Sequence, residues 1–326
     1  MFKRPDALLR LPHLYVQNAN AISSPLTWGF PAPSAFTGFV HALSRQTEKE
    51  LGIRLDGTGI VSHGFSPQAS SPPGKRTQVF HLTRNPIKKN GNTASIVEEG
   101  RIHLDLSLLI GVYSAEPLFE DEDELQTLAH QISQRANAMR LAGGSLLPHP
   151  HRRPDPPELH FWPHNADEAR QKSRQIRRRL LPGFALVERQ DKLERHLTDL
   201  KTDSVLEALL DLSRLNYEPP TDIKEGEPAR WTVRSKPGWL VPLPLGYGAI
   251  SPLYPPGEVE NSRDPETPFR FVETLLGLGE WISPHRIDDM EKLLWYHDAD
   301  PENGLYRCRN DFAASPSTAQ TTMNKD

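Results

Sequence analysis

The sequence predicts an α+β sandwich in which helices cover one face of a β-sheet. Three patterns indicate it. Apolar and polar residues alternate in residues 9–20, as in a strand with one buried face. Apolar residues recur with helical spacing after Pro33, and further strands are predicted at residues 57–65 and 101–113. A strand, a helix and further strands in this order form a sheet with helices packed against it.

The first helix is predicted to begin at Pro33, because proline fits the first helical turn, where its missing N–H group would be unpaired anyway. Phe36, Phe39, Val40 and Leu43 then fall on one face of that helix. This helix therefore buries one side against the sheet.

Two later helices are marked by their ends. Acidic residues open the segment 120–144 and arginines come late in it, which is the order that the helix dipole favours. Gly143 and Gly144 are expected to close it. The next helix has Asn165 as its candidate N-cap.

The C-terminal part is predicted to contain an amphipathic helix at residues 205–215 and a further helix opened by Ser283. Between them lies an apolar run that contains Pro242 and Pro244. Proline cannot donate to a sheet, so this run is predicted to be an edge strand or an irregular strand. Its exposed aromatics, such as Trp239, predict either a surface that a partner subunit covers or part of the protein's own core.

Composition narrows the class of protein. The chain has 326 residues and a single cysteine, Cys308, so it forms no intrachain disulfide and suits a reducing cytoplasm. Its most apolar stretch, from Leu104, is too short to cross a bilayer, so we expect a cytoplasmic protein without membrane contact. Phosphate-loop, dinucleotide-binding and nucleophile-elbow motifs do not occur. We therefore predict no cofactor, no metal and no catalytic residue.

Charge is segregated along the chain, although the net charge is only −4. Residues 71–101 hold 6 Lys+Arg against 2 Asp+Glu, and residues 135–195 hold 13 against 7. Residues 196–326 hold 13 against 22. Localised basic segments on an acidic protein are typical of a polyanion-binding surface joined to surfaces for other partners, and an unevenly charged solvated surface is the alternative.

The first basic segment is predicted to be a projecting hairpin, because turn signals at Pro73-Gly74 and Asn90-Gly91 flank an alternating run. In the second, an arginine stripe that includes Arg174 and Arg178 lies on one helix face. That stripe could follow phosphates, face an acidic partner protein or simply be solvated.

Several motifs together resemble the family of second Csy subunits of type I-F CRISPR surveillance complexes, within the Cas-five family. The resemblance spans residues 6–310. It rests on the segments NANAISSPLTWGFPAPSAFTGFVHALSR, GIVSHGF, GKRTQVFHLTRNP, IVEEGRIHLDLSLLIGV, AMRLAGGSLLP, RRLLPGFALV, KPGWLVPLPLGY, SPLYPPGEV and RFVETLLGLGEW.

The resemblance implies an RNA-recognition-motif-like (ferredoxin-like) palm, made of residues 1–73 and 183–312 with a C-terminal extension. Residues 74–182 would form an inserted basic hairpin and helical thumb, and residues 313–326 a disordered tail. Such a subunit holds the 5′ handle of the CRISPR RNA, forms a heterodimer with the large subunit and abuts a backbone subunit. Target DNA beside the protospacer-adjacent motif is left open as a further partner.

In type I-F systems another protein cuts the RNA, so the resemblance implies a non-catalytic, RNA-binding role. The alternatives are an endoribonuclease that processes CRISPR repeat RNA and a bridging subunit without RNA contact. Single-stranded RNA is held by stacking on aromatics, by bonds to base edges and by cations at phosphates. The candidate RNA-binding residues are Asn18, Asn20, Ser23, Ser24, Trp28, Lys75, Arg76, Arg84, Asn85, Lys88, Arg140, Arg174 and Arg178.

Overall fold

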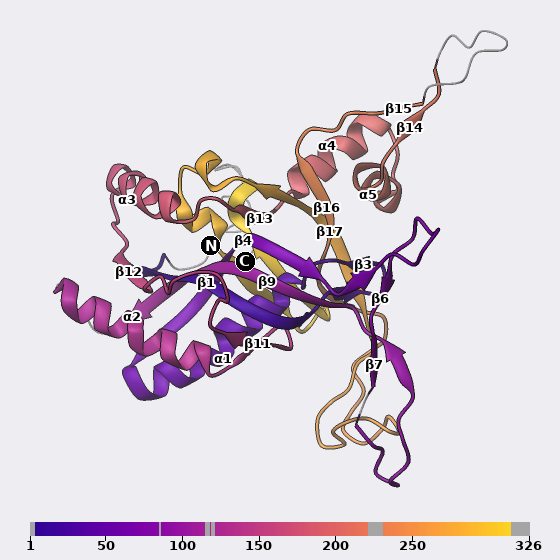
Figure 1. Ribbon diagram of the computed structural model, residues 1–326, viewed down its shortest axis with the longest axis horizontal. Coiled ribbons are helices and arrows are strands. Elements are labelled where there is room, and N and C mark those ends of the chain that lie inside the picture. The colour runs from indigo at the N-terminus through magenta and orange to yellow at the C-terminus, as the bar shows by residue number, and fades with distance from the viewer. Residues whose placement is uncertain (1–3, 85, 115–117, 119–120, 221–230, 314–326) are drawn as a thin grey trace.

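The computed structural model describes residues 4–84, 86–114, 118, 121–220 and 231–313, and it is an α+β structure around one large antiparallel sheet (Figure 1). Within these residues the sheet contains eleven strands. They are β1 (Ala7–Asn20), β4 (Ile53–Pro67), β9 (Arg101–Ser114), β10 (Arg140–Leu141), β11 (Gly144–Leu147), β12 (Glu158–Phe161), β13 (Phe184–Glu188), β16 (Trp239–Ala249), β17 (Val272–Ile282), β18 (Trp295–Asp300) and β19 (Leu305–Asn310).

The first half of the sheet has the spatial order β11-β1-β9-β4. Helix α1 (Pro33–Leu51) connects β1 to β4, and helix α2 (Glu122–Asn137) connects β9 to the β10–β11 pair. Strand β9 lies in the middle, paired with β1 on one side and β4 on the other. Residues 101–147 thus contribute strands to the same sheet as residues 7–67, although the predicted thumb included them, so the insertion boundary drawn from the sequence is too wide here.

Helix α1 follows the prediction, since Phe36, Phe39, Val40 and Leu43 are all buried in the largest apolar core. Helix α2 packs on the same face of the sheet and contributes residues such as Ile132 to that core.

The predicted end of α2 is wrong. The helix ends at Asn137, and Gly143 lies in the turn between β10 and β11, where its φ of +76° suits glycine.

Helices cover both faces of the sheet, which corrects the prediction of one covered face. Helix α3 (Ala166–Arg179) packs Ala169 and Ile176 into a second core, on the sheet face opposite α1. Its N-cap is Asn165, as predicted, whose side chain accepts a 2.8 Å hydrogen bond from the backbone N–H of Asp167. Figure 1 shows α3 and α1 on either side of the sheet.

The second half of the sheet curls into a ring. The pairings run β4-β13-β17-β16-β19-β18, and β18 returns to β4 where Trp295 pairs with Thr58. Trp295 is fully buried and donates from Nε1 to the Leu186 carbonyl at 2.9 Å, which joins β18 to β13. Cys308 is buried beside α1. The ring therefore has a filled interior continuous with the core under α1.

Strand β16 is regular enough to pair on both sides, but not along its whole length. Pro242 and Pro244 pair only with β17, and pairing with β19 begins at Gly246, after a register shift. The stretch that contains the two prolines therefore has only one neighbouring strand among the described residues. The edge-strand prediction is thus confirmed for this part of β16 but not for its second half. The helix predicted after Ser283 is absent from the described residues, and two short 3-10 helices, Pro284–Arg286 and Met290–Leu293, take its place.

A small lobe and several arms project from the ring and sheet (Figure 1). The lobe consists of α4 (Gln190–Leu200) and α5 (Val205–Ser213), which pack on β16 and β17 through a third small core. The arms are two-stranded sheets: β2 (Ile22–Ser24) with β3 (Thr27–Trp28), β5 (Ala69–Ser70) with β6 (Val79–Phe80), β7 (Leu82–Arg84) with β8 (Ile96–Glu98), and β14 (Tyr217–Glu218) with β15 (Thr232–Val233).

Among the described residues, no helix is long and apolar enough to span a bilayer. The predicted tail falls almost entirely on residues outside those described.

Candidate nucleic-acid interface

The β2–β3 hairpin contains three of the predicted RNA-binding residues, and two of them are used in its turn. The hydroxyls of Ser23 and Ser24 lie 2.8 Å and 2.7 Å from Thr27 Oγ1, and Ser24 Oγ also accepts the backbone N–H of Leu26 at 3.1 Å. The serines therefore fix the hairpin's shape. Trp28, in contrast, is 52% exposed and contacts Phe80 edge to face.

Asn18 and Asn20 hold the point where β1 leads into this hairpin. The Asn20 side chain donates from Nδ2 to the Ile22 carbonyl at 2.8 Å, and its Oδ1 accepts from the backbone N–H of Ile22 at 3.1 Å. Asn18 adopts a left-handed conformation, with φ of +59°, and its side-chain oxygen accepts from the Gln68 amide. The structure thus brings five predicted residues together, although four of them also have structural bonds.

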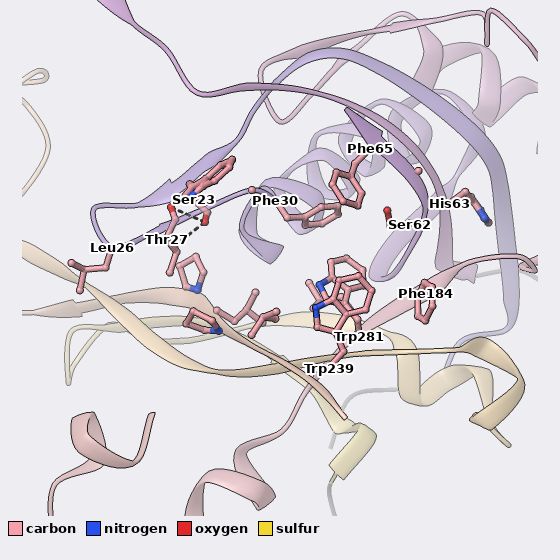
Figure 2. A pocket seen from close by; sticks show the side chains of 18 residues that line it. Ser23, Leu26, Thr27, Phe30, Ser62, His63, Phe65, Phe184, Trp239 and Trp281 are labelled. Carbon is pink, nitrogen blue, oxygen red and sulfur yellow. Dashed lines mark hydrogen bonds between the residues drawn. The ribbon is translucent and has the colours of Figure 1, made fainter. Parts of the chain in front are cut away.

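A cavity of about 530 Å³ lies between this hairpin and the end of the strand ring (Figure 2). Its walls come from four separate parts of the chain: the hairpin, the end of β4, the start of β13, and the paired ends of β16 and β17. Lining residues include Trp28, Phe30, Phe65, Phe184, Trp239 and Trp281.

The aromatic rings around the cavity touch one another. Phe30 packs edge to face on Trp281 at 4.9 Å between ring centroids, Trp281 lies 6.3 Å from Trp239, and Trp239 lies 5.4 Å from Phe184. Phe65 is 63% exposed and Trp239 50% exposed. Such exposed aromatic surface is costly in water, and its concentration at one cavity is typical of a binding site.

A polar cluster extends from the cavity onto the sheet face opposite α1. His63 lines the cavity, and its Nε2 lies 2.7 Å from the hydroxyl of Ser107, while its ring lies 4.2 Å from that of His13. Asp105 bonds His13 Nδ1 at 2.9 Å and pairs with Arg152 at 3.3 Å. The cluster thereby holds the loop that contains Arg152 onto the sheet.

Two pKa values in this cluster are shifted. Burial lowers the pKa of His63, which favours the neutral ring. Burial alone would raise the pKa of Asp105, but the hydrogen bond from His13 and the nearby cations lower it below its usual value. Asp105 is thus an ionised acceptor. Within the described residues, no group of three or more His, Cys, Asp or Glu side chains is arranged to hold a metal ion.

Four of the predicted basic residues belong to the projecting arms. Lys75 and Arg76 are exposed in the connection between β5 and β6, and Lys88 is exposed in the turn of the β7–β8 arm. Arg84 belongs to β7, where only the backbone is described, and Asn85 lies outside the described residues.

Three other predicted cations lie apart from the cavity or are engaged locally. Arg140 donates to the Gly143 carbonyl. Arg174 and Arg178 are exposed on α3, which Figure 1 shows far from β3. Arg174 instead lines a separate hollow together with Lys292. The structure therefore does not join the α3 stripe to the hairpin site.

Phe65, Phe184 and Trp281 were not predicted as site residues. Each sits at the end of a strand, and only the closed ring brings these strand ends together. Their one sequence signal is an aromatic residue at the boundary of an apolar run, which does not distinguish a core residue from a site residue.

An open aromatic cavity with exposed cationic arms nearby is typical of ligand-binding proteins. A comparison with known protein families identifies the family of this chain. The family described as "CRISPR-associated protein (Cas_Csy2)" matches residues 9–308. The chain is also 58% identical over 313 residues to the CRISPR-associated protein Csy2 of Pseudomonas aeruginosa (strain UCBPP-PA14), which covers 93% of this chain and 95% of that protein. The chain belongs to the Csy2 family of CRISPR-associated proteins.

This result confirms the resemblance as far as the second Csy subunit of type I-F systems is concerned. Membership of the wider Cas-five family remains a prediction.

Proposed function

We propose that this chain is a non-catalytic subunit of the type I-F Csy complex that binds the 5′ handle of the CRISPR RNA. The observation that supports this best is the aromatic cavity beside the β2–β3 hairpin, since single strands are bound by aromatic platforms next to basic segments. In this proposal, Lys75, Arg76 and Lys88 on the projecting arms contact phosphates, where exposed cations release counterions on binding.

We also propose that the first half of the sheet is an RNA-recognition-motif-like palm. Its strand, helix, strand, strand, helix, strand succession supports this, because the ferredoxin-like motif has the same succession. The β5–β6 and β7–β8 arms would then form the basic part of the thumb.

The partners in this proposal are the CRISPR RNA, the large subunit in a heterodimer and a backbone subunit, all in the cytoplasm. Membership of the Csy2 family supports them. Exposed apolar residues on α5, such as Leu206 and Leu210, give the small lobe a surface suited to protein contact. Contact with target DNA stays open.

The proposal is tested by replacing Lys75, Arg76 and Lys88 together with alanine and measuring affinity for handle RNA as a function of salt. Each lost phosphate contact should lower the slope of log K against log salt by about 0.7 on a single strand. The weakening should be similar for any RNA sequence, because phosphate contacts read no bases.

The matched control replaces Arg45, Lys49 and Arg286, which are exposed elsewhere, so that the net charge changes equally. An unchanged slope in the arm variant, or an equal change in the control, contradicts the proposed role of the arms. Absence of RNA binding by the wild-type chain within its assembled complex contradicts the function itself and favours a bridging subunit.

One observation favours a second function, an endoribonuclease that processes repeat RNA. His13 is bonded to the ionised Asp105 and lies beside His63, and pairs of histidines perform general acid and base catalysis without metal. Incubating the protein with repeat RNA in the presence of a chelator separates the two functions. We expect no product, whereas a discrete product that disappears in the His13→Ala variant establishes the enzyme.

A further inference from the structure

The lining of the cavity is uncharged. Among its lining residues there is no Lys, Arg, Asp or Glu, and the nearest titratable group is His63. Both ring nitrogens of His63 are already engaged, by the Pro182 carbonyl at 2.6 Å and by Ser107, and burial lowers the pKa of the ring, which favours its neutral form. A phosphate or any other ion would lose its hydration here without gaining a counter-charge, so the cavity excludes charged groups.

The cavity is not purely apolar either. Trp239 and Trp281 present indole N–H donors, and neither donates a hydrogen bond to another described residue. The hydroxyl of Ser62 likewise has no bonded partner among them. Trp N–H groups usually find an acceptor when they are covered, so an apolar side chain from a partner protein would leave donors unpaired.

The rings also have a geometry suited to a flat guest. Trp239 and Trp281 are tilted by 48° to one another, and the ring of Phe184 stands at 74° to Trp239. Figure 2 shows these three rings on one side of the cavity and the ring of Phe65 on the other. The cavity volume is ordinary for small-molecule sites and large enough for a flat ring with acceptors on its edge.

We infer that this cavity receives one unstacked nucleobase of the bound RNA, which lies against Trp239 and accepts a hydrogen bond from an indole N–H. The inference rests on the proposed function. It adds that one nucleotide is held through its base in an uncharged pocket, while neighbouring phosphates stay outside. This nucleotide's contribution to affinity should therefore depend on the base and be nearly independent of salt.

The test combines a Trp239→Ala variant with handle RNAs in which each nucleotide in turn is replaced by an abasic one. With the wild-type protein, one abasic position should weaken binding by roughly 5- to 140-fold, the range for loss of one stacked base. With Trp239→Ala, intact RNA should bind more weakly to a similar extent, and the same abasic position should cost less than about twofold.

Trp231→Ala is the matched control, because that tryptophan is also exposed and does not line the cavity. Trp239→Phe keeps an aromatic plane and should retain most of the affinity, which guards against a folding defect in the alanine variant. The abasic scan of the wild-type protein needs no variant at all.

The outcomes separate this inference from the proposed function. No binding of intact handle RNA by the wild-type complex refutes the function. Binding that no abasic position weakens, or an abasic penalty that persists unchanged in Trp239→Ala, overturns the inference alone. Trp239→Ala with normal RNA affinity but without co-purification of the large subunit shows that the cavity takes a protein side chain, and also overturns it.

Discussion

A buried ion cluster joins β12 to β1 and offers a quantitative test of the structure. Arg10 in β1 is fully buried, and its guanidinium bonds Glu158 at 3.1 Å and Asp155 at 2.8 Å. Glu158 is also bonded by His160. The hydrogen bond from His160 and then the charge and hydrogen bond of Arg10 lower the pKa of Glu158 from 4.5 to about 2. We predict that Glu158→Gln destabilises the protein.

The magnitude follows from the pKa shift, since one unit is worth about 1.4 kcal/mol. The shift of the Glu158 pKa therefore corresponds to at most about 3.5 kcal/mol in the free energy of unfolding, and the effect should be smaller because the Gln carbonyl still accepts one bond and solvent screens the partly exposed carboxylate. A carboxylate with a lowered pKa stabilises the fold fully above its unfolded pKa. This stabilisation is lost as the pH falls from about 4.5 toward 2, and about 1.4 kcal/mol of it is lost by pH 3.5.

Urea unfolding followed by tryptophan fluorescence at pH 7 and pH 3.5 measures both quantities. The wild type and Glu158→Gln should differ by up to about 3.5 kcal/mol at pH 7 and by about 1.4 kcal/mol less at pH 3.5. Glu48→Gln, at an exposed position on α1, is the control and should change neither value. Equal stabilities at pH 7, or a difference that does not shrink at low pH, would refute this account of Glu158.

Three further substitutions test other parts of the fold. Asp105→Asn should speed amide hydrogen exchange in residues 148–153, because it removes the charge that holds this loop on the sheet. The wild type should show the same loss of protection as the pH falls below about 3.8, and unchanged protection would contradict the assigned bonds. Gly246→Ala should lower stability by more than about 1 kcal/mol in a thermal melt, because the added Cβ collides with the Tyr306 carbonyl across the β16–β19 pair. Gly38→Ala should instead stabilise α1 by about 0.5–1 kcal/mol, since open space surrounds that position, and a loss there would show hidden crowding.

Local patterns in the sequence predicted the elements whose signals are local. Helix α1 and its buried face followed from the spacing of Phe36 and Leu43, and the start of α3 followed from Asn165. The end of α2 was misjudged because Gly143 serves a turn between two short strands instead of the helix end. A glycine with positive φ suits both roles, so sequence alone does not separate them.

The site was less predictable because tertiary contacts create it. Trp28 was identified from its place in a polar, proline-rich stretch, but its cavity also needs Phe184 and Trp281, which join it only through ring closure. Ser23 and Ser24 were predicted as RNA contacts, and their hydroxyls are partly used by Thr27. A serine or asparagine side chain can bond either nearby groups of its own chain or a ligand, so the sequence alone does not tell which of these it does.

Closure of the strand ring has a consequence for how the chain is made. Strands β1, β4 and β9 can pair once residue 114 has left the ribosome, but β4 receives β18 at Thr58 only after residue 295 has been synthesised. At ordinary elongation rates this interval lasts roughly 10 to 40 seconds. Throughout it the nascent chain carries an incomplete sheet with unpaired strand groups, which other chains can pair with. The last strands close the ring. They are therefore needed both to pair these strand groups, which protects the chain from aggregation, and to form the aromatic cavity.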